Sequence, residues 1–154
     1  MRAVLLEPEA GMVIQAADAS DLPAVRRLLE SQHLPLDGID EHVSTMVIAK
    51  KGTEVVGAAA VELYADGALL RSVVVDPVAQ GQGLGHRLSD AALSMAKDRG
   101  TRTAFLLTTT AETFFPKLGF EKIVRDDVPA SVQASIEFQS ACPASAVVMR
   151  KRLA

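Results

Sequence analysis

Residues 71–88 of the chain read Arg71-Ser72-Val73-Val74-Val75-Asp76-Pro77-Val78-Ala79-Gln80-Gly81-Gln82-Gly83-Leu84-Gly85-His86-Arg87-Leu88. The pattern predicts a buried strand, a sharp turn and a glycine-rich loop that leads straight into a helix. Three glycines stand at every second position of the loop, so its backbone N–H groups can approach a ligand closely. Because the following helix adds the positive end of its dipole, this loop is suited to bind an anion.

The spacing of the glycines excludes two familiar anion-binding loops. A dinucleotide-binding turn needs Gly-x-Gly-x-x-Gly, and counting from Gly81 puts His86 where the third glycine should stand. The phosphate loop of nucleoside triphosphatases needs Gly-Lys-Ser/Thr at its end, which Leu84-Gly85-His86 does not supply. What remains is Gln80-x-x-Gly83-x-Gly85 after a strand that ends Val75-Asp76-Pro77.

This loop resembles the acyl-CoA pyrophosphate loop of the GNAT family of N-acetyltransferases. A second stretch, residues 108–120, resembles another motif of that family, in which Asn-x-x-Ala is followed by an aromatic pair and then by Gly-Phe. The positions that match in identity or type are Ala111, Phe114, Phe115, Gly119 and Phe120. The two motifs extend the resemblance over roughly residues 12–153. It implies one GNAT domain over residues 1–154, with residues 1–11 as an N-terminal extension, and an α/β fold with a mixed sheet flanked by helices.

The hydrophobic pattern predicts seven strands and five helices. The strands are expected at residues 12–16, 46–49, 55–64, 69–75, 103–107, 120–124 and 146–152. The first helix is expected to run from an N-cap at Ser20 to residue 31. The other four are expected at residues 37–44, 85–99, 111–118 and 129–138. Asp66-Gly67 between two apolar runs predicts a hairpin with these two loop residues, which brings Glu62 opposite Arg71.

The composition is that of an ordinary globular domain of 154 residues, 49% hydrophobic and 23% charged. A net charge of −3 and the absence of a long basic run give no reason to expect a nucleic acid partner. Cys142 is the only cysteine, which excludes an intramolecular disulfide and suits a reducing compartment. Because the chain has no apolar run of about 18 residues and no signal sequence, we expect a cytoplasmic protein with no membrane partner.

The resemblance implies direct transfer of the acetyl group of acetyl-CoA to the primary amine of a small acceptor, without a metal. The backbone of Val73, Val74 and Val75 is expected to pair with the peptide-like pantetheine arm, and the N–H of Val74 to polarise the thioester carbonyl. Thr108 stands where many relatives have Asn and can still hydrogen-bond the amide-containing arm. The pyrophosphate is expected on the loop residues Gln80, Gly81, Gln82, Gly83, Leu84, Gly85 and His86.

Phe115 departs from the family pattern, in which many members have a tyrosine that is assigned as the general acid for the departing CoA thiolate. A phenyl ring has no proton to donate. The departing thiolate then takes its proton from solvent or from a different hydroxyl group, or it leaves without a general acid. A thiol with a pKa of roughly 8 to 9 is a tolerable leaving group without help.

Arg71 and Ser72 are the candidate acceptor-binding residues. A charge inside an otherwise apolar strand needs a reason, and the planar guanidinium suits a carboxylate or another oxyanion. Glu62 is the candidate base for the incoming ammonium, with His33 and His42 as alternatives. The competing interpretation is an ion pair between Glu62 and Arg71 that only satisfies two half-buried charges.

Smaller signatures resemble amino-acid N-acetyltransferases that include short N-acetylglutamate synthases and, more closely, those found with arsenic-resistance systems. The first resemblance is carried by residues 106–110, Phe114-Phe115, Val128-Pro129 and residues 142–146, and the closer one by Leu69-Leu70-Arg71-Ser72 and Cys142-Pro143-Ala144-Ser145-Ala146. They imply an amino acid or an amino-acid-like oxyanion as acceptor, and a homodimer is a candidate assembly because dimers are common in the family. Cys142 is expected to be a buried residue or a wall of the acceptor pocket. Two alternatives stay open: a protein or peptide N-acetyltransferase of the same fold, and a non-catalytic CoA-binding regulatory domain, which the missing tyrosine favours.

Overall fold

The computed structural model describes residues 12–141 and 145–153. These residues form one seven-stranded sheet in the order β1-β2-β3-β4-β5-β7-β6, with parallel pairing between β4 and β5 and antiparallel pairing elsewhere. The strands are β1 (Met12–Ala16), β2 (Met46–Lys51), β3 (Glu54–Tyr64), β4 (Gly67–Val75), β5 (Thr103–Thr108), β6 (Glu121–Ile123) and β7 (Val147–Arg152). The helices are α1 (Leu22–Ser31), α2 (Leu84–Asp98) and α3 (Ala130–Gln133). The predicted α/β class with a mixed sheet is confirmed.

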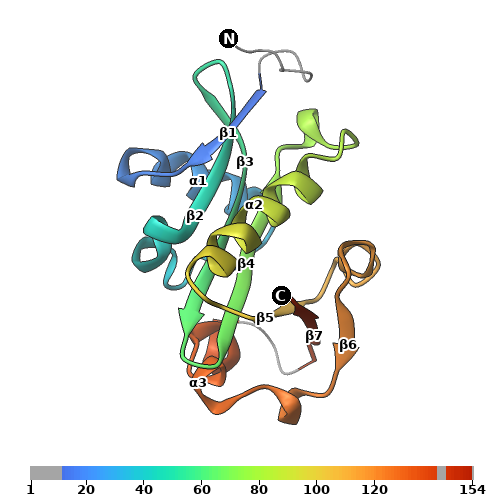
Figure 1. The fold of residues 1–154 in the computed structure, drawn as a ribbon. Helices are drawn as coiled ribbons and strands as arrows, with labels where there is room; N and C mark the ends of the chain where they lie inside the picture. Colours follow the sequence, from blue (N-terminus) through green and yellow to red (C-terminus); the bar gives the residue numbers. More distant parts are fainter. Residues whose placement is uncertain (1–11, 142–144, 154) are drawn as a thin grey trace.

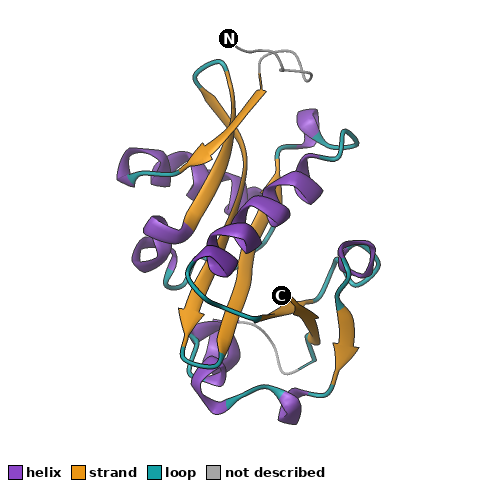
Figure 2. Cartoon of the chain, in the orientation of Figure 1, coloured by secondary structure: helices purple, strands orange, loops and turns teal. Residues whose placement is uncertain are grey.

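Helices cover both faces of the sheet (Figures 1 and 2). α2 crosses the long central strands, and its Leu88 shares one hydrophobic core with Ala59 of β3. On the opposite face, Leu29 of α1 shares a second core with Ala60 of β3. Neighbouring residues of a strand point to opposite faces, so β3 contributes to both cores.

The start of α2 is fixed by the packing of its apolar side. Leu84, Leu88, Ala92 and Ala96 recur every four residues and are all buried, as expected for one face of a helix. Because the glycine loop is the short connection from β4 to this helix, it is held between the end of β4 and the first turn of α2.

The hairpin loop between β3 and β4 differs from the prediction. The two loop residues are Ala65-Asp66, and Gly67 already belongs to β4. A Cβ at Gly67 would lie 2.8 Å from the Phe105 ring of the neighbouring β5. The glycine therefore serves close packing between strands, not the turn.

This correction moves the register of the hairpin by two residues. Glu62 faces Leu69, and Arg71 faces Ala60, so the predicted direct pairing of Glu62 with Arg71 was wrong. Because side chains alternate with a period of two, the shift leaves Glu62 and Arg71 on the same face of the sheet. They are diagonal neighbours, and their side chains meet.

Two predicted helices are broken. The helix expected over 111–118 is only a 3₁₀ turn, Phe115–Leu118, because Pro116 has no N–H for an α-helical bond. The helix expected over 129–138 splits into α3 and a π-helical turn, Glu137–Ala141. At the break, Ser135 Oγ accepts the backbone N–H of Glu137 at 3.2 Å. The serine side chain thus takes a backbone donor that a regular helix would bond to a carbonyl oxygen.

The two early helices also begin differently from the prediction. Ser20 is not the cap: it lies inside a 3₁₀ turn, Ala19–Asp21, that leads directly into α1. Asp18 caps this turn, because its carboxylate accepts the N–H of Ser20 and Asp21 reciprocally accepts the N–H of Asp18, both at 2.9 Å. The segment expected as a helix over 37–44 is a 3₁₀ helix, Ile39–Thr45.

Candidate active site

β4 and β5 are parallel neighbours that separate along their length. They pair only at Ala68–Ala104 and Leu69–Phe105. Beyond these pairs the strands diverge (Figure 1), and a cavity of about 700 Å³ lies between their carboxyl ends. The backbone of residues 70–75 is therefore not paired to β5 on this side.

The cavity is lined by the ends of both strands, the glycine loop with the start of α2, the loop after β5, and two more distant segments. The distant segments are residues 32–35, which follow α1, and Glu137. The predicted site residues that line the cavity are Arg71, Ser72, Val73, Val74, Val75, Gln80, Gly81, Gly83, Leu84, Gly85, His86, Thr108 and Phe115. Glu62, Gln82 and the alternative base candidate His42 lie outside this lining, whereas His33 belongs to it.

A β-bulge bends β4 where it borders the cavity. Between the pairs Ala60–Arg71 and Ala58–Val74, β4 has one residue more than β3. Ser72 lies in this bulge and has left-handed backbone geometry, with φ 58°, which is uncommon for a residue other than glycine. The acceptor candidates Arg71 and Ser72 therefore lie at and just before the bulge. The backbone of residues 73–75, which is expected to bind the pantetheine arm, follows them.

The glycine loop presents backbone rather than side chains. Gly81 and Gly83 have left-handed φ values of 83° and 77°, and a Cβ at either would meet nothing within 4 Å. Glycine is therefore required here by the left-handed backbone conformation and not by close packing against a neighbouring group. Gln80 Nε2 donates to the carbonyl oxygen of Val75 at 2.9 Å, which ties the loop to the end of β4. α2 begins at Leu84 without a side-chain cap, so its first N–H groups and its dipole suit an anion such as a pyrophosphate.

The second motif packs onto the first. A Cβ on Gly85 would lie 3.3 Å from Cζ of Phe114, so the glycine allows this ring to reach the start of α2. Ring centroids lie 5.0 Å apart for Phe114–Phe115 and 5.9 Å apart for Phe115–Phe120, both edge to face. Thr108 Oγ1 accepts a backbone N–H of the following turn at 2.9 Å. Phe115 lines the cavity without a group that could donate a proton.

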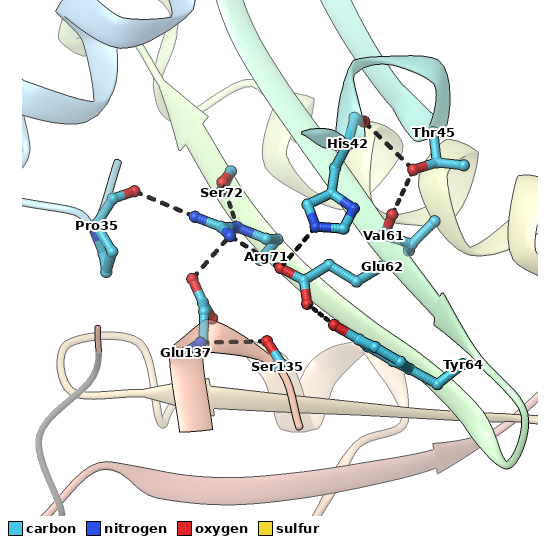
Figure 3. A network of polar contacts seen from close by, with 10 residues as sticks. All are labelled: Pro35, His42, Thr45, Val61, Glu62, Tyr64, Arg71, Ser72, Ser135 and Glu137. Carbon is cyan, nitrogen blue, oxygen red and sulfur yellow. Dashed lines mark hydrogen bonds and ion pairs between the residues drawn. The ribbon is translucent and has the colours of Figure 1, made fainter. Parts of the chain in front are cut away.

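Arg71 is the centre of a buried polar network at the cavity wall (Figure 3). Its Nη1 donates to Glu62 Oε2 at 2.8 Å, and its Nε lies 3.3 Å from Glu137 Oε2. Nε also donates to Ser72 Oγ at 3.1 Å, and Nη2 donates to the carbonyl oxygen of Pro35 at 3.5 Å. The side chains of Arg71 and Glu62 are 0% exposed. Two carboxylates thus contact one guanidinium in the described part of this network.

Glu62 lies behind Arg71 and does not reach the cavity lining. Its Oε1 accepts the hydroxyl of Tyr64, and its Oε2 lies 3.3 Å from His42 Nε2 as well as against Arg71 (Figure 3). Burial pushes the pKa of Glu62 up, but hydrogen bonds from Ser135, Tyr64 and Arg71 outweigh burial and hold this pKa below its usual range. Burial and the bond to Glu62 raise the pKa of Tyr64 to about 12. Glu62 is therefore an ionised carboxylate, and its position allows it to fix the guanidinium of Arg71.

The three histidines are in different surroundings. His33 lines the cavity just after α1 and has a left-handed φ of 59°. His42 contacts Glu62 and does not belong to the cavity lining. His86 is exposed at the start of α2, with its Nε2 3.1 Å from Asp90 Oδ2.

Glu137 is the site residue that the sequence did not reveal. It is the only carboxylate among the described residues of the cavity lining. It reaches the site from the π-helical turn, far along the chain from Arg71, and no motif marks it. The residue pattern of 129–138 predicts a regular helix and gives no signal for a carboxylate at the cavity.

Three further predictions concern absences or residues outside the described ranges. Cys142 lies outside the described residues, so its predicted role stays a prediction. Within residues 12–141 and 145–153, no group of three or more His, Cys, Asp or Glu side chains could hold a metal ion. In the same ranges, every helix is too short or too polar to span a bilayer.

A family model described as an acetyltransferase (GNAT) domain matches residues 42–122. These residues include β4 with its bulge, the glycine loop, α2, β5 and the second motif, which together form most of the cavity wall. The chain belongs to the GNAT acetyltransferase family. The predicted family, fold and enzyme class are thereby confirmed.

Proteins similar to this GNAT acetyltransferase include a named amino-acid acetyltransferase and solved structures with the same fold. It is 32% identical over 130 residues to an amino-acid acetyltransferase of Mycobacterium tuberculosis, covering 78% of this chain and 74% of that protein. N-acetylglutamate synthase from Neisseria gonorrhoeae, solved with coenzyme A and N-acetyl-glutamate, shares the fold with a TM-score of 0.80 and 24% identity. That match covers 93% of this chain and 35% of the synthase, so the chain spans about a third of it. A Mycobacterium tuberculosis protein solved in complex with CoA matches with a TM-score of 0.78 and 28% identity, covering 92% of this chain and 99% of that one.

Proposed function

We propose that this acetyltransferase transfers the acetyl group of acetyl-CoA to the primary amine of an amino acid or an amino-acid-like oxyanion. The observation that carries the proposal is the cavity between β4 and β5, with an anion loop at one end and a guanidinium in its wall. A relative named amino-acid acetyltransferase and a structural neighbour that binds CoA support it. The likeness to the arsenic-resistance-associated subgroup stays a prediction.

The donor half of the cavity suits CoA. A pyrophosphate on residues 81–86 would be held by backbone N–H groups and the dipole of α2, because the loop contributes no Lys or Arg side chain to the lining. The amides of the pantetheine arm match those N–H and C=O groups of residues 73–75 that point away from β3, into the gap that β5 leaves. Thr108 lies on the opposite wall, at the end of β5.

Acetyl-CoA supplies a thioester that the amine attacks directly. The incoming ammonium first gives one proton to water, which frees its electron pair. The new C–N bond then forms, the C–S bond breaks with its electron pair going to sulfur, and the second proton lost by the nitrogen also goes to water. The N–H of Val74, the predicted donor to the oxygen that gains negative charge, points toward β3, because the N–H of Asp76 donates to the carbonyl oxygen of Val56 and hydrogen-bonded pairs alternate along this antiparallel ladder. A backbone N–H of β4 that points to the cavity is proposed to donate to that oxygen instead. Phe115 has no proton to offer, so sulfur leaves as a thiolate or takes a proton from water. A thiol pKa of roughly 8 to 9 makes the thiolate an adequate leaving group.

Arg71 and Ser72 act at the acceptor end. Of the contacts that Arg71 makes, the one from Nη2 to the carbonyl oxygen of Pro35 is the longest, at 3.5 Å, which is the weakest geometry for a hydrogen bond. An acceptor oxyanion that takes the place of this carbonyl would gain a charge-assisted bond without disturbing Glu62. Because Glu62 is out of reach of the cavity, its proposed role is to hold Arg71 and not to accept the proton.

Release of free thiol from acetyl-CoA with a panel of acceptors tests the proposal. The panel contains glutamate, glutamine, aspartate, a phosphinate amino acid and short peptides, and mass spectrometry identifies the N-acetyl product. Turnover with amino acids and none with peptides is expected. Turnover with peptides alone would instead assign a peptide N-acetyltransferase, and tight CoA binding without turnover of any amine would assign a regulatory domain.

The cytoplasmic location and the homodimer stay predictions from the sequence. Sedimentation equilibrium of the purified chain tests the dimer directly.

A further inference from the structure

We propose that Glu137 binds the ammonium group of the acceptor, beside the guanidinium of Arg71 that takes the acceptor's oxyanion. The proposal rests on the proposed function, because it names the residue that selects an amino acid within that site. It replaces Glu62, which the sequence favoured, as the carboxylate that meets the amine.

The placement of Glu137 is the first support. Its side chain is 5% exposed, and it contributes to the cavity lining, where it is the only described carboxylate. Contacts on both its side chain and its backbone hold it: Arg71 Nε lies 3.3 Å from its Oε2, and its backbone N–H donates to Ser135 Oγ at 3.2 Å. A carboxylate that is buried and held in this way is pre-organised for a cation that enters the cavity.

The charges of the network are the second support. Arg71 carries one positive charge and contacts both Glu62 and Glu137, and Glu62 is fully buried away from the cavity. His42 contacts Glu62 and lies outside the cavity lining. The negative charge that faces the cavity is thus that of Glu137. A carboxylate as buried as this one is stabilised by an ammonium more than it would be in water.

The two groups together match the head of an amino acid. An acceptor with an ammonium and an oxyanion on nearby atoms needs one carboxylate and one guanidinium side by side, and Glu137 and Arg71 are in direct contact. The opposite interpretation is that the Glu137 carboxylate occupies the place of the acceptor's own carboxylate on Arg71. In that case removal of the Glu137 charge would strengthen the binding of a carboxylate ligand.

Calorimetric titration of the CoA-loaded protein with two matched pairs of probes separates these interpretations. The pairs are L-glutamine with glutaramate and L-glutamate with glutarate, in which the second member lacks only the amino group. The wild type is expected to bind each amino acid at least about tenfold more tightly than its partner, the factor expected for one charge-assisted hydrogen bond. Glu137→Gln should abolish this preference by weakening only the amino acids, and Glu137→Asp should keep part of it.

Glu121→Gln is the matched control, because Glu121 is exposed on β6, where it pairs with Arg150 away from the cavity. It should keep the full preference. Thermal unfolding of each variant verifies the fold, and Glu137→Gln is expected to fold because Arg71 still has Glu62.

The proposal is overturned if Glu137→Gln keeps the preference, if it binds glutarate more tightly than the wild type does, or if the wild type binds none of the four probes. Thiol release by the wild type is measured separately. A wild type that shows the preference but releases no thiol would contradict the proposed function and support the ammonium site. A wild type that turns over, with an unchanged preference in Glu137→Gln, would contradict only the ammonium site.

Discussion

Glu62 and Arg71 form a fully buried ion pair, with 2.8 Å between Oε2 and Nη1, although neither residue is the direct partner of the other across the hairpin. The pair is diagonal, and it leaves the Nε side of the guanidinium to Ser72 and Glu137. A charge pair without exposure is expensive to bury unless its remaining hydrogen-bonding groups are satisfied. Tyr64, Ser135 and His42 are further partners of Glu62.

Glu62→Gln should destabilise the fold markedly. Removing one partner of a buried ion pair typically costs about 3–5 kcal/mol, and the residual contact of Arg71 with Glu137 places the expected loss near the lower value. Urea unfolding measures the free energy of unfolding. Asp40→Asn is the control, since Asp40 pairs with Arg26 at the surface and should cost less than about 1 kcal/mol. Equal losses in the two variants would contradict the structural role of the pair.

The phenol of Tyr64 should ionise at a higher pH than that of a free tyrosine. It is the only tyrosine in the chain, so phenolate absorbance reports this residue alone. Burial and the hydrogen bond to Glu62 raise its pKa from 10.0 to about 12 in the folded protein. Because the folded-state pKa is raised, the stabilisation is fully present below the unfolded value and is lost as pH rises toward 12. Spectrophotometric titration should give a midpoint near 12 in buffer and near 10 in urea, and equal midpoints would disprove the buried contact.

The fold could be predicted mainly where a local pattern has only one structural solution. The apolar run of β4, the glycine loop and the four-residue spacing in α2 each predict their element without knowledge of distant residues. Exceptions occur where a single residue changes the local bonding. Pro116 prevents the helix over 111–118, and Ser135 interrupts the one over 129–138.

The candidate site could be predicted on its donor side but not fully on its acceptor side. Residues 80–86 are consecutive, so one stretch of sequence predicts a wall of the cavity, to which all of them except Gln82 contribute. Glu137 reaches Arg71 only because the π-helical turn packs near the hairpin, and this depends on tertiary contacts that sequence spacing does not contain. The hairpin register similarly depends on the fit of Gly67 against Phe105, a residue of another strand.

Gly83→Ala should weaken CoA binding. The residue has φ 77° with open space around it, so an added Cβ clashes with nothing but strains the backbone by about 1–2 kcal/mol. Relief of that strain would move the N–H groups that are proposed to hold the pyrophosphate, and we expect a loss of about tenfold in affinity, or about 1.4 kcal/mol. Gly52→Ala is the matched control, with φ 64°, open space and a place in the β2–β3 turn. It should lose similar stability and keep its CoA affinity in calorimetry.

Phe115→Tyr should restore a proton donor for the leaving thiolate. The ring packs edge to face against Phe114 and Phe120, and tyrosine keeps these contacts while adding one hydroxyl at a residue of the cavity wall. We expect kcat to rise by about tenfold, below the 10²–10⁴ range of a well-placed acid, and the KM for acetyl-CoA to change little. Initial rates against pH measure it. An unchanged kcat would show that thiolate departure does not limit turnover.

Arg71→Lys tests whether the guanidinium fork itself is needed at the acceptor end. Lysine keeps the positive charge between Glu62 and Glu137 but cannot contact both carboxylates and an acceptor oxyanion with a planar set of donors. The KM for amino acid acceptors is expected to rise by about tenfold or more, because one charge-assisted bond to the acceptor is lost. The KM for acetyl-CoA should stay the same, since the glycine loop and residues 73–75 are untouched. A variant that is folded and keeps its KM for acidic amino acids would assign Arg71 to structure alone.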